Sequence, residues 1–153
     1  GKPSVLGAAS GAVAGLVAIT PASGFVLPGG ALVIGIAAGV LCFWASTSVK
    51  TLLGYDDSLD AFGVHCIGGI VGAMLTGWFA YGPLSATDSS PAGIVGGVPQ
   101  LLIQGKAVIA TLVYSGLMSL VLLKIIDWTI GLRVSRDEEV EGLDVVLHGE
   151  RLG

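Results

Sequence analysis

The chain has 153 residues, of which 53% are hydrophobic and only 12% are charged, and its net charge is −4. Soluble domains have about 25% charged residues, so this composition predicts a membrane protein. The negative net charge argues against nucleic-acid binding. The charged side chains are concentrated after Arg133, which predicts an apolar part followed by a polar tail.

Four apolar stretches predict four transmembrane helices, at about residues 4–20, 29–53, 59–81 and 99–132. A helix of about 20 residues crosses the hydrocarbon of a bilayer. The first stretch is short and ends at Pro21, and the last is long enough to tilt or to extend beyond the bilayer. We therefore expect an all-α, polytopic membrane helix bundle over residues 1–132 and a separate tail over residues 133–153.

The distribution of basic residues predicts the orientation. Four crossings place both ends of the chain and the loop around Leu53 to Leu59 on one side of the membrane. The only basic residue assigned to the other side is Lys106. Basic residues mark the cytoplasmic side, so we expect both ends to be cytoplasmic. The basic residues on this side are Lys2, Lys50, Arg133, Arg136 and Arg151, with Lys124 near it.

Glycines repeat every four positions in three of the stretches. Small residues at this spacing let membrane helices approach closely, although glycine is also common in membrane helices generally. We expect a tightly packed bundle. The repeats are Gly7, Gly11 and Gly15, then Gly35 and Gly39, then Gly68 and Gly72.

The two cysteines, Cys42 and Cys66, both lie in apolar stretches. They are expected to be small packed thiols and not a disulfide. The first residue is Gly1 and no signal peptide is visible, so we expect a fragment of a longer protein.

His65 lies inside an apolar, glycine-rich run that is flanked by Asp60. A histidine at this depth must face a partner helix, a cavity or a pore, because exposure to lipid is costly. Its neutral imidazole has one donor and one acceptor nitrogen, so it could bind a small polar molecule or pass a proton. The alternative is a core histidine bonded to a backbone carbonyl; we favour the functional interpretation.

An acidic cluster of Asp56, Asp57 and Asp60 precedes the third stretch. Asp57 or Asp60 can cap the helix by accepting backbone N–H bonds, and negative charge suits a helix N-terminus. Capping is the simpler interpretation, and direct handling of a cation is the alternative. Ser10 and Thr20 are hydroxyls on the first stretch, and such side chains usually bond to the carbonyl one turn earlier.

Several classes of enzyme are not supported. The sequence has no glycine-rich phosphate loop, no zinc-ligand spacing and no nucleophile paired with a base. We therefore expect no catalytic residues, no metal and no cofactor. The tail, with Glu141 to Asp144 and His148 to Glu150, is expected to be turn-rich, and its composition alone is that of a solvated segment.

Three motifs, in order, resemble the Amt/Mep branch of the ammonium transporter (Amt/Mep/Rh) family. The first is Gly1 to Ser4 followed by Gly7 to Ala22, and the second is Asp56 to His65. The third is Gly131 to Val134 with Glu141 to Asp144 and His148 to Glu150. Together they span nearly the whole chain.

The resemblance implies an eleven-helix fold that assembles as a homotrimer, each subunit holding a narrow hydrophobic pore with two mid-membrane histidines. This chain resembles the last four helices and the cytoplasmic tail. His65 matches the second histidine, whereas the first histidine and the external recognition site belong to other parts of the fold. The resemblance also puts Ser10 and Thr20 on the helix bordering the pore, and Ala61 on its wall beside His65.

Further roles are implied for the acidic cluster and the tail. Asp57 and Asp60 match acidic positions, structural or cation-handling, at the cytoplasmic start of the histidine helix. In the family the tail packs under the trimer, and its regulatory motif includes Gly142, Asp144, His148 and Gly149. Val146 stands where some plant members carry a phosphorylated threonine, so we expect no such switch. A PII-type signal protein is a further partner in prokaryotic members.

The implied function is ammonium or ammonia transport across the plasma membrane for nitrogen uptake, with methylammonium as an analogue. An apolar pore opposes passage of the intact ion, so we expect the ion to lose its proton before it passes. The sequence leaves open whether net transport is electrogenic. The alternative function is an ammonium sensor that signals through its cytoplasmic tail.

Overall fold

The computed structural model describes residues 4–150. Lys2 and Arg151, which contributed to the predicted orientation, and Gly1 to Pro3 of the first motif lie outside these residues. The chain forms two compact units, residues 1–110 and 111–153. Within the described residues the regular structure is helical, apart from isolated bridges such as Val26 with Ala80.

Four long apolar helical segments confirm the predicted membrane helix bundle. They are Val5–Ala22, Pro28–Leu53, Phe62–Phe79 and Val98–Thr129. Each is long and apolar enough to cross a bilayer. The last segment is the single helix α6, which begins in the first unit and continues into the second.

The three other segments contain changes of helical geometry. The first is α1 (Val5–Ile19) with the tighter turn Thr20–Ala22. The second consists of α2 (Pro28–Trp44), a π-helical turn and α3 (Lys50–Leu53). The third is another π-helical turn and α4 (Ile67–Phe79). We call Ala45–Val49 the first π turn and Phe62–Cys66 the second π turn.

The ends of these helices follow from local chemistry. The Ser4 hydroxyl accepts a bond from the Gly7 amide, 3.0 Å away, and so caps α1. Pro28 occupies the first turn of α2, where its missing N–H costs nothing. Gly54 ends α3 with φ 64°, a left-handed conformation that glycine adopts without steric cost.

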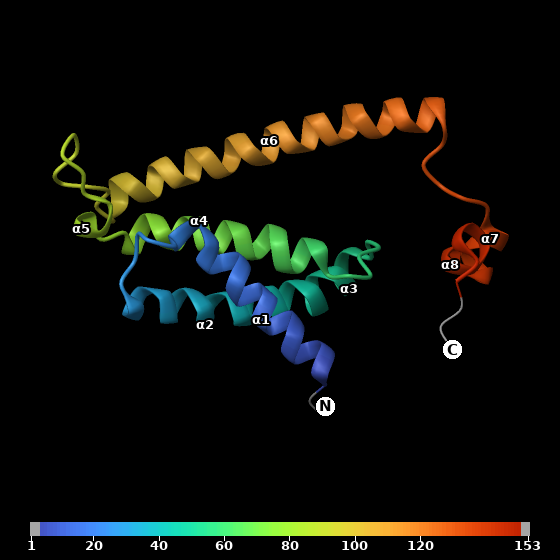
Figure 1. Cartoon of the computed structure of the whole chain (residues 1–153), viewed down its shortest axis with the longest axis horizontal. Coiled ribbons are helices and arrows are strands. Elements are labelled where there is room, and N and C mark those ends of the chain that lie inside the picture. Colours follow the sequence, from blue (N-terminus) through green and yellow to red (C-terminus); the bar gives the residue numbers. More distant parts are fainter. Residues whose placement is uncertain (1–3, 151–153) are drawn as a thin grey trace. The chain divides into compact units, whose positions relative to one another are not determined.

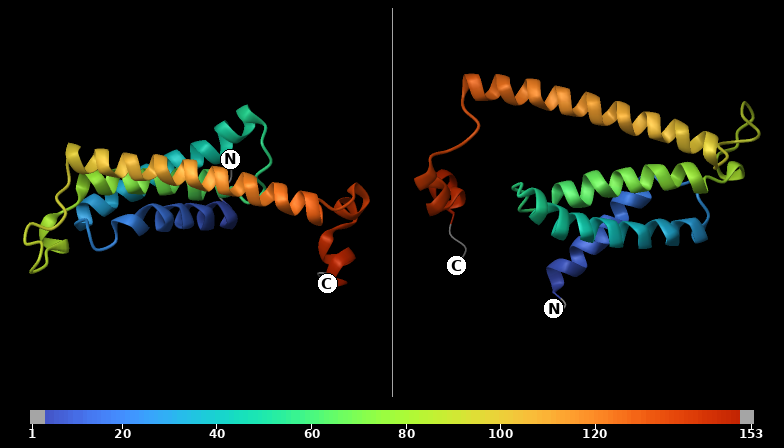
Figure 2. Two further views of the ribbon diagram at one scale, coloured as in Figure 1. Left: turned by 90° about the horizontal axis from the view of Figure 1, so that it is seen from above. Right: turned by 180° about the vertical axis from the view of Figure 1, so that it is seen from behind.

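In the first unit, α2 and α4 run antiparallel and α1 crosses them obliquely (Figures 1 and 2). One core cluster where they meet contains Ala18, Ala22, Ile34 and Ala38. A second contains Ala14, Cys42 and Val64. Because most of these side chains are small, the helices approach closely and gain their contact energy from dispersion.

The glycine repeats contribute unequally to this packing. Gly68 and Gly72 are buried on α4, where an added β-carbon would meet atoms of α1 or α2. Gly11, Gly15, Gly35 and Gly39, by contrast, have open space beside them. The prediction of close approach is therefore correct for α4, whereas the helices do not meet so tightly at these four glycines of α1 and α2.

The loop between α4 and α6 is more structured than the sequence indicates. It contains the short helix α5 (Gly82–Ser85) and a turn closed by Thr87 and Ser90. The amide of Gly97 bonds to the carbonyl of Gly77, 3.0 Å away. A β-carbon at Gly77 would lie 3.0 Å from the α-carbon of Leu101, so α6 begins close against α4.

The tail forms two short helices, α7 (Arg136–Glu141) and α8 (Leu143–His148). Ser135 and Glu138 form a reciprocal capping box at the start of α7. Gly142, with φ 101°, separates the helices, and Gly149, with φ 66°, ends α8. The expected turns are present at both glycines, but the residues between them are helical.

Candidate functional site

His65 lies in the second π turn with its side chain exposed. Its neighbours Gly63 and Val64 are buried on the opposite face of the turn. Among residues 4–150 the imidazole has no hydrogen-bond partner. π turns inside helices occur frequently at functional sites.

Ala61 precedes His65 by four residues and is also exposed. Residues four apart on a helix lie on the same face. The two positions assigned to the pore wall therefore share one surface of the third segment. Neither of them lines the cavity described next.

Ser10 and Asp60 both line a cavity of about 410 Å³ in the first unit. Other polar residues on its wall are Ser4, Ser46 and Thr47. The structure therefore brings these two sequence-predicted residues to the same space, Ser10 from α1 and Asp60 from the loop before the third segment.

Thr20 is not part of that cavity. Its hydroxyl donates a hydrogen bond to the carbonyl of Leu16, 2.7 Å away on the same helix. Ser10 and Thr20 are ten positions apart, which corresponds to about 15 Å along a helix. They are therefore too far apart to form one cluster.

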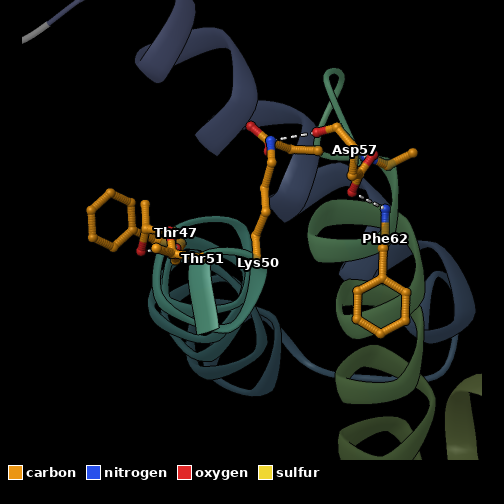
Figure 3. A network of polar contacts seen from close by, with 8 residues as sticks. Thr47, Lys50, Thr51, Asp57 and Phe62 are labelled. Carbon is orange, nitrogen blue, oxygen red and sulfur yellow. Dashed lines mark hydrogen bonds and ion pairs between the residues drawn. The ribbon is translucent and has the colours of Figure 1, made fainter. Parts of the chain in front are cut away.

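Asp57 caps the beginning of the third segment. Its two carboxylate oxygens accept bonds from the amides of Ala61, at 2.8 Å, and Phe62, at 2.9 Å. Figure 3 shows the carboxylate directed at the Phe62 nitrogen. A carboxylate at this end satisfies free amides and suits the helix dipole.

Asp60 has a different role. Its carboxylate forms an ion pair with Lys50, at an Nζ–Oδ1 distance of 2.8 Å, and its backbone has φ 54°. The Lys50 ammonium also donates to the carbonyl of Asp57, and Figure 3 shows the lysine side chain reaching toward the loop that carries Asp57. The end of the second segment is thereby tied to the beginning of the third.

Sequence reasoning did not identify Lys50 or Ser46 as part of this site. Lys50 was noted only for its charge, although an isolated lysine near the end of an apolar stretch indicates that a partner is needed. The Ser46 hydroxyl is buried without a hydrogen-bond partner among the described residues. It lies against Gly63, where an added β-carbon would be 2.9 Å from the Ser46 backbone nitrogen.

The residues assigned to regulation lie on the tail helices. Asp144 and His148 occupy the first and last turns of α8, and both are exposed. The Glu150 amide donates to the carbonyl of Asp144, 2.9 Å away, across the turn at Gly149. Gly142 and Gly149 thus delimit α8, and the two polar side chains, four residues apart, share one of its faces.

Hydrogen bonds lower the pKa of two tail carboxyls. The Ser135 hydroxyl and amide hold the pKa of Glu138 below its ordinary value. The guanidinium of Arg133, bonded at 2.6 and 3.2 Å, does the same for Glu139. Among residues 4–150 there is no group of three or more His, Cys, Asp or Glu side chains that could hold a metal ion.

Comparisons with known proteins agree on one family. A family profile described as the Ammonium Transporter Family matches residues 1–152. An ammonium transporter of Aquifex aeolicus is 50% identical over 99% of this chain and 35% of its own length. One of Bacillus subtilis is 46% identical over 98% of the chain and 37% of its own length.

A solved structure agrees with the sequence comparisons. The crystal structure of Saccharomyces cerevisiae Mep2 matches with a TM-score of 0.78 and 38% identity, over 89% of this chain and 31% of that one. The chain thus spans about a third of the length of the relatives it matches. With four apolar helices and a family match over nearly its whole length, the chain is a multi-pass membrane protein that belongs to the ammonium transporter family.

Proposed function

We propose that this chain forms part of an ammonium transporter and contributes His65 to its conduction path. The main support is the family match over residues 1–152, together with relatives that are named ammonium transporters. The substrate would be ammonium or ammonia, with methylammonium as an analogue. The function is transport and not catalysis.

The geometry around His65 supports this role. The imidazole is exposed on a π turn, and Ala61 occupies the same face one turn earlier. The opposite face of the turn is buried against the first and second segments through Val64 and Gly63. The histidine is thus carried by a firmly packed segment while both ring nitrogens stay available for hydrogen bonds.

The energetics favour removal of the proton before passage. An unpaired cation in an apolar pore loses its hydration, at a cost far above that for a neutral amine. Uncharged ammonia needs only hydrogen bonds, which a neutral imidazole can provide. We therefore propose that the ion is deprotonated, that ammonia passes His65, and that a proton is returned on the other side.

The remaining roles follow from the same resemblance. We propose that the complete protein is a homotrimer in the plasma membrane, that both ends of this segment are cytoplasmic, and that residues 133–153 regulate transport. Ser10 and Thr20 would border the pore. The tail face with Asp144 and His148, flanked by Gly142 and Gly149, would contact neighbouring subunits. The cytoplasmic surface could receive a PII-type signal protein.

Transport in liposomes tests the proposal. The complete transporter containing this segment is reconstituted, and methylammonium uptake and electrical current are measured for the wild type, His65→Ala and Cys66→Ala. Cys66 is a matched control because it follows His65 directly on the same π turn. We expect His65→Ala to lose flux or selectivity for ammonium over potassium, and Cys66→Ala to keep both.

Two results would contradict the proposal. Equal flux and selectivity in His65→Ala and the wild type would remove His65 from the conduction path. Binding of ammonium by the wild type without any flux would favour the alternative, a sensor that signals through its tail.

A further inference from the structure

Lys50 joins the second segment to the backbone that leads into the histidine turn. Its ammonium bonds to the Asp60 carboxylate at 2.8 Å and to the carbonyl of Asp57. The side chains of Lys50 and Asp60 are 29% and 34% exposed, so the pair is only partly shielded from solvent. The lysine therefore makes two contacts with the short stretch between the two aspartates.

That stretch determines how the third segment begins. Asp57 caps the segment through the amides of Ala61 and Phe62. The carbonyl of Asp60 accepts a bond from the Val64 amide at 2.8 Å, immediately before His65. Any shift of Asp57 or Asp60 would therefore be transmitted through the backbone to the second π turn.

Asp60 is held in an uncommon backbone conformation. It is the one non-glycine residue with positive φ among the described residues, at 54°. Aspartate adopts this region more readily than most residues, but the conformation is still strained and persists only where neighbouring contacts maintain it. The Lys50 ammonium contributes to maintaining it through the Asp60 carboxylate, together with the bond from the Asp60 amide to the Asp57 carbonyl at 3.2 Å.

A second fixed point lies within the π turns themselves. A β-carbon at Gly63 would be 2.9 Å from the nitrogen and 3.0 Å from the α-carbon of Ser46, so the backbones of the two π turns are in close contact. With the Lys50–Asp60 pair adjacent, the second π turn is fixed at two places relative to the second segment. Two fixed points restrict both the rotation of the second π turn and its distance from the second segment.

We propose that Lys50 is a positioning residue for His65: its contacts with Asp57 and Asp60 set the orientation in which the second π turn presents the imidazole. The lysine itself need not touch the substrate. This inference builds on the proposed role of His65 in transport, but the orientation of the imidazole can be measured independently of flux.

The test uses the complete transporter with labelled histidine. The imidazole signal of His65 is recorded by nitrogen-15 NMR, assigned with His65→Ala, and methylammonium uptake is measured on the same preparations. The variants are Lys50→Met and Lys50→Arg. Lys106→Met is the matched control, because Lys106 is an exposed lysine on α6.

We expect Lys50→Met to shift the His65 signal and to lower the maximal uptake roughly tenfold, as displaced functional groups commonly do, with little change in KM. Lys50→Arg should restore the His65 signal and most of the uptake, because a guanidinium can donate both to the Asp60 carboxylate and to the Asp57 carbonyl. Lys106→Met should change neither. A wild-type His65 signal and wild-type uptake in Lys50→Met would overturn the inference.

Asp60→Asn covers the case in which Lys50→Met does not fold. Asparagine tolerates positive φ, so this change weakens the ion pair and spares the backbone conformation. It should shift the His65 signal in the same direction, and an unshifted signal would overturn the inference. If the wild type carries no substrate, the transport proposal fails, whereas the His65 signal still decides whether Lys50 positions the ring.

Discussion

Gly72 of α4 lies directly against the backbone of Ala18 on α1. A β-carbon built on Gly72 would be 2.8 Å from both the carbonyl carbon and the α-carbon of Ala18. No rotation of a side chain can relieve such a contact, because the neighbouring atoms belong to a helix backbone. The crossing of α1 and α4 therefore requires glycine at this position.

Gly72→Ala should destabilise the bundle. Overpacking of this kind typically costs about 1–3 kcal/mol, so we expect a lower midpoint of thermal unfolding for the detergent-solubilised protein. Gly69→Ala is the matched control, because Gly69 is on the same helix and has open space beside it. Equal midpoints for the two variants would show that α1 and α4 do not approach as closely as described.

The four helices were predictable from the sequence because hydropathy over about 20 residues is a local signal. Their fine structure was not. The third segment begins at Phe62 instead of near Leu59, since the positive φ of Asp60 delays regular helix formation. Neither π turn corresponds to a recognisable pattern of hydropathy or of capping residues in the sequence.

The candidate site was predictable only in part. His65 stood out because a histidine in an apolar run is rare, and the Asp57 cap follows a known local rule. The Lys50–Asp60 pair joins two segments, and the meeting of Ser10 with Asp60 depends on how α1 crosses the others. Such relationships arise from tertiary packing, so spacing along the chain does not reveal them.

Asp57→Ala should loosen the beginning of the third segment. The change removes the acceptors of two backbone amides, and loss of a cap typically costs about 0.5–2 kcal/mol. We expect faster hydrogen exchange at the amides of Ala61 and Phe62. Asp56→Ala is the control, since Asp56 is exposed and accepts no hydrogen bond among the described residues. Similar exchange in both variants would rule out the capping role.

Cys42 and Cys66 should differ in reactivity. Both are free thiols, but Cys42 is only 2% exposed and lies in a core cluster with Ala14 and Val64. A maleimide reagent should therefore label a Cys66→Ser variant, which retains Cys42, more slowly than a Cys42→Ser variant. Denaturation in dodecyl sulfate should make the rates equal. Equal rates in the folded protein would mean that Cys42 is not buried.

The start of α7 should be sensitive to acid. Hydrogen bonds hold the pKa values of Glu138 and Glu139 below their ordinary value of 4.5. A carboxyl whose pKa is lower in the folded state stabilises that state above the unfolded pKa, and this contribution is lost as the pH falls through the folded pKa. We therefore expect the amides of α7 to stay protected from hydrogen exchange at pH 6 and to lose part of this protection below about pH 4.5.

Hydrogen exchange at the amides of Glu138 and Glu139, corrected for intrinsic rates, measures this loss. Glutamine at position 138 can still form the capping box, so Glu138→Gln should weaken the pH dependence while it preserves protection at pH 6. Glu141→Gln is the control, because Glu141 is exposed and its carboxylate has no hydrogen-bond partner among residues 4–150. If the pH dependence of Glu138→Gln matched that of the control, the Ser135–Glu138 box would not be the acid-sensitive element, and the Arg133–Glu139 pair would remain as its source.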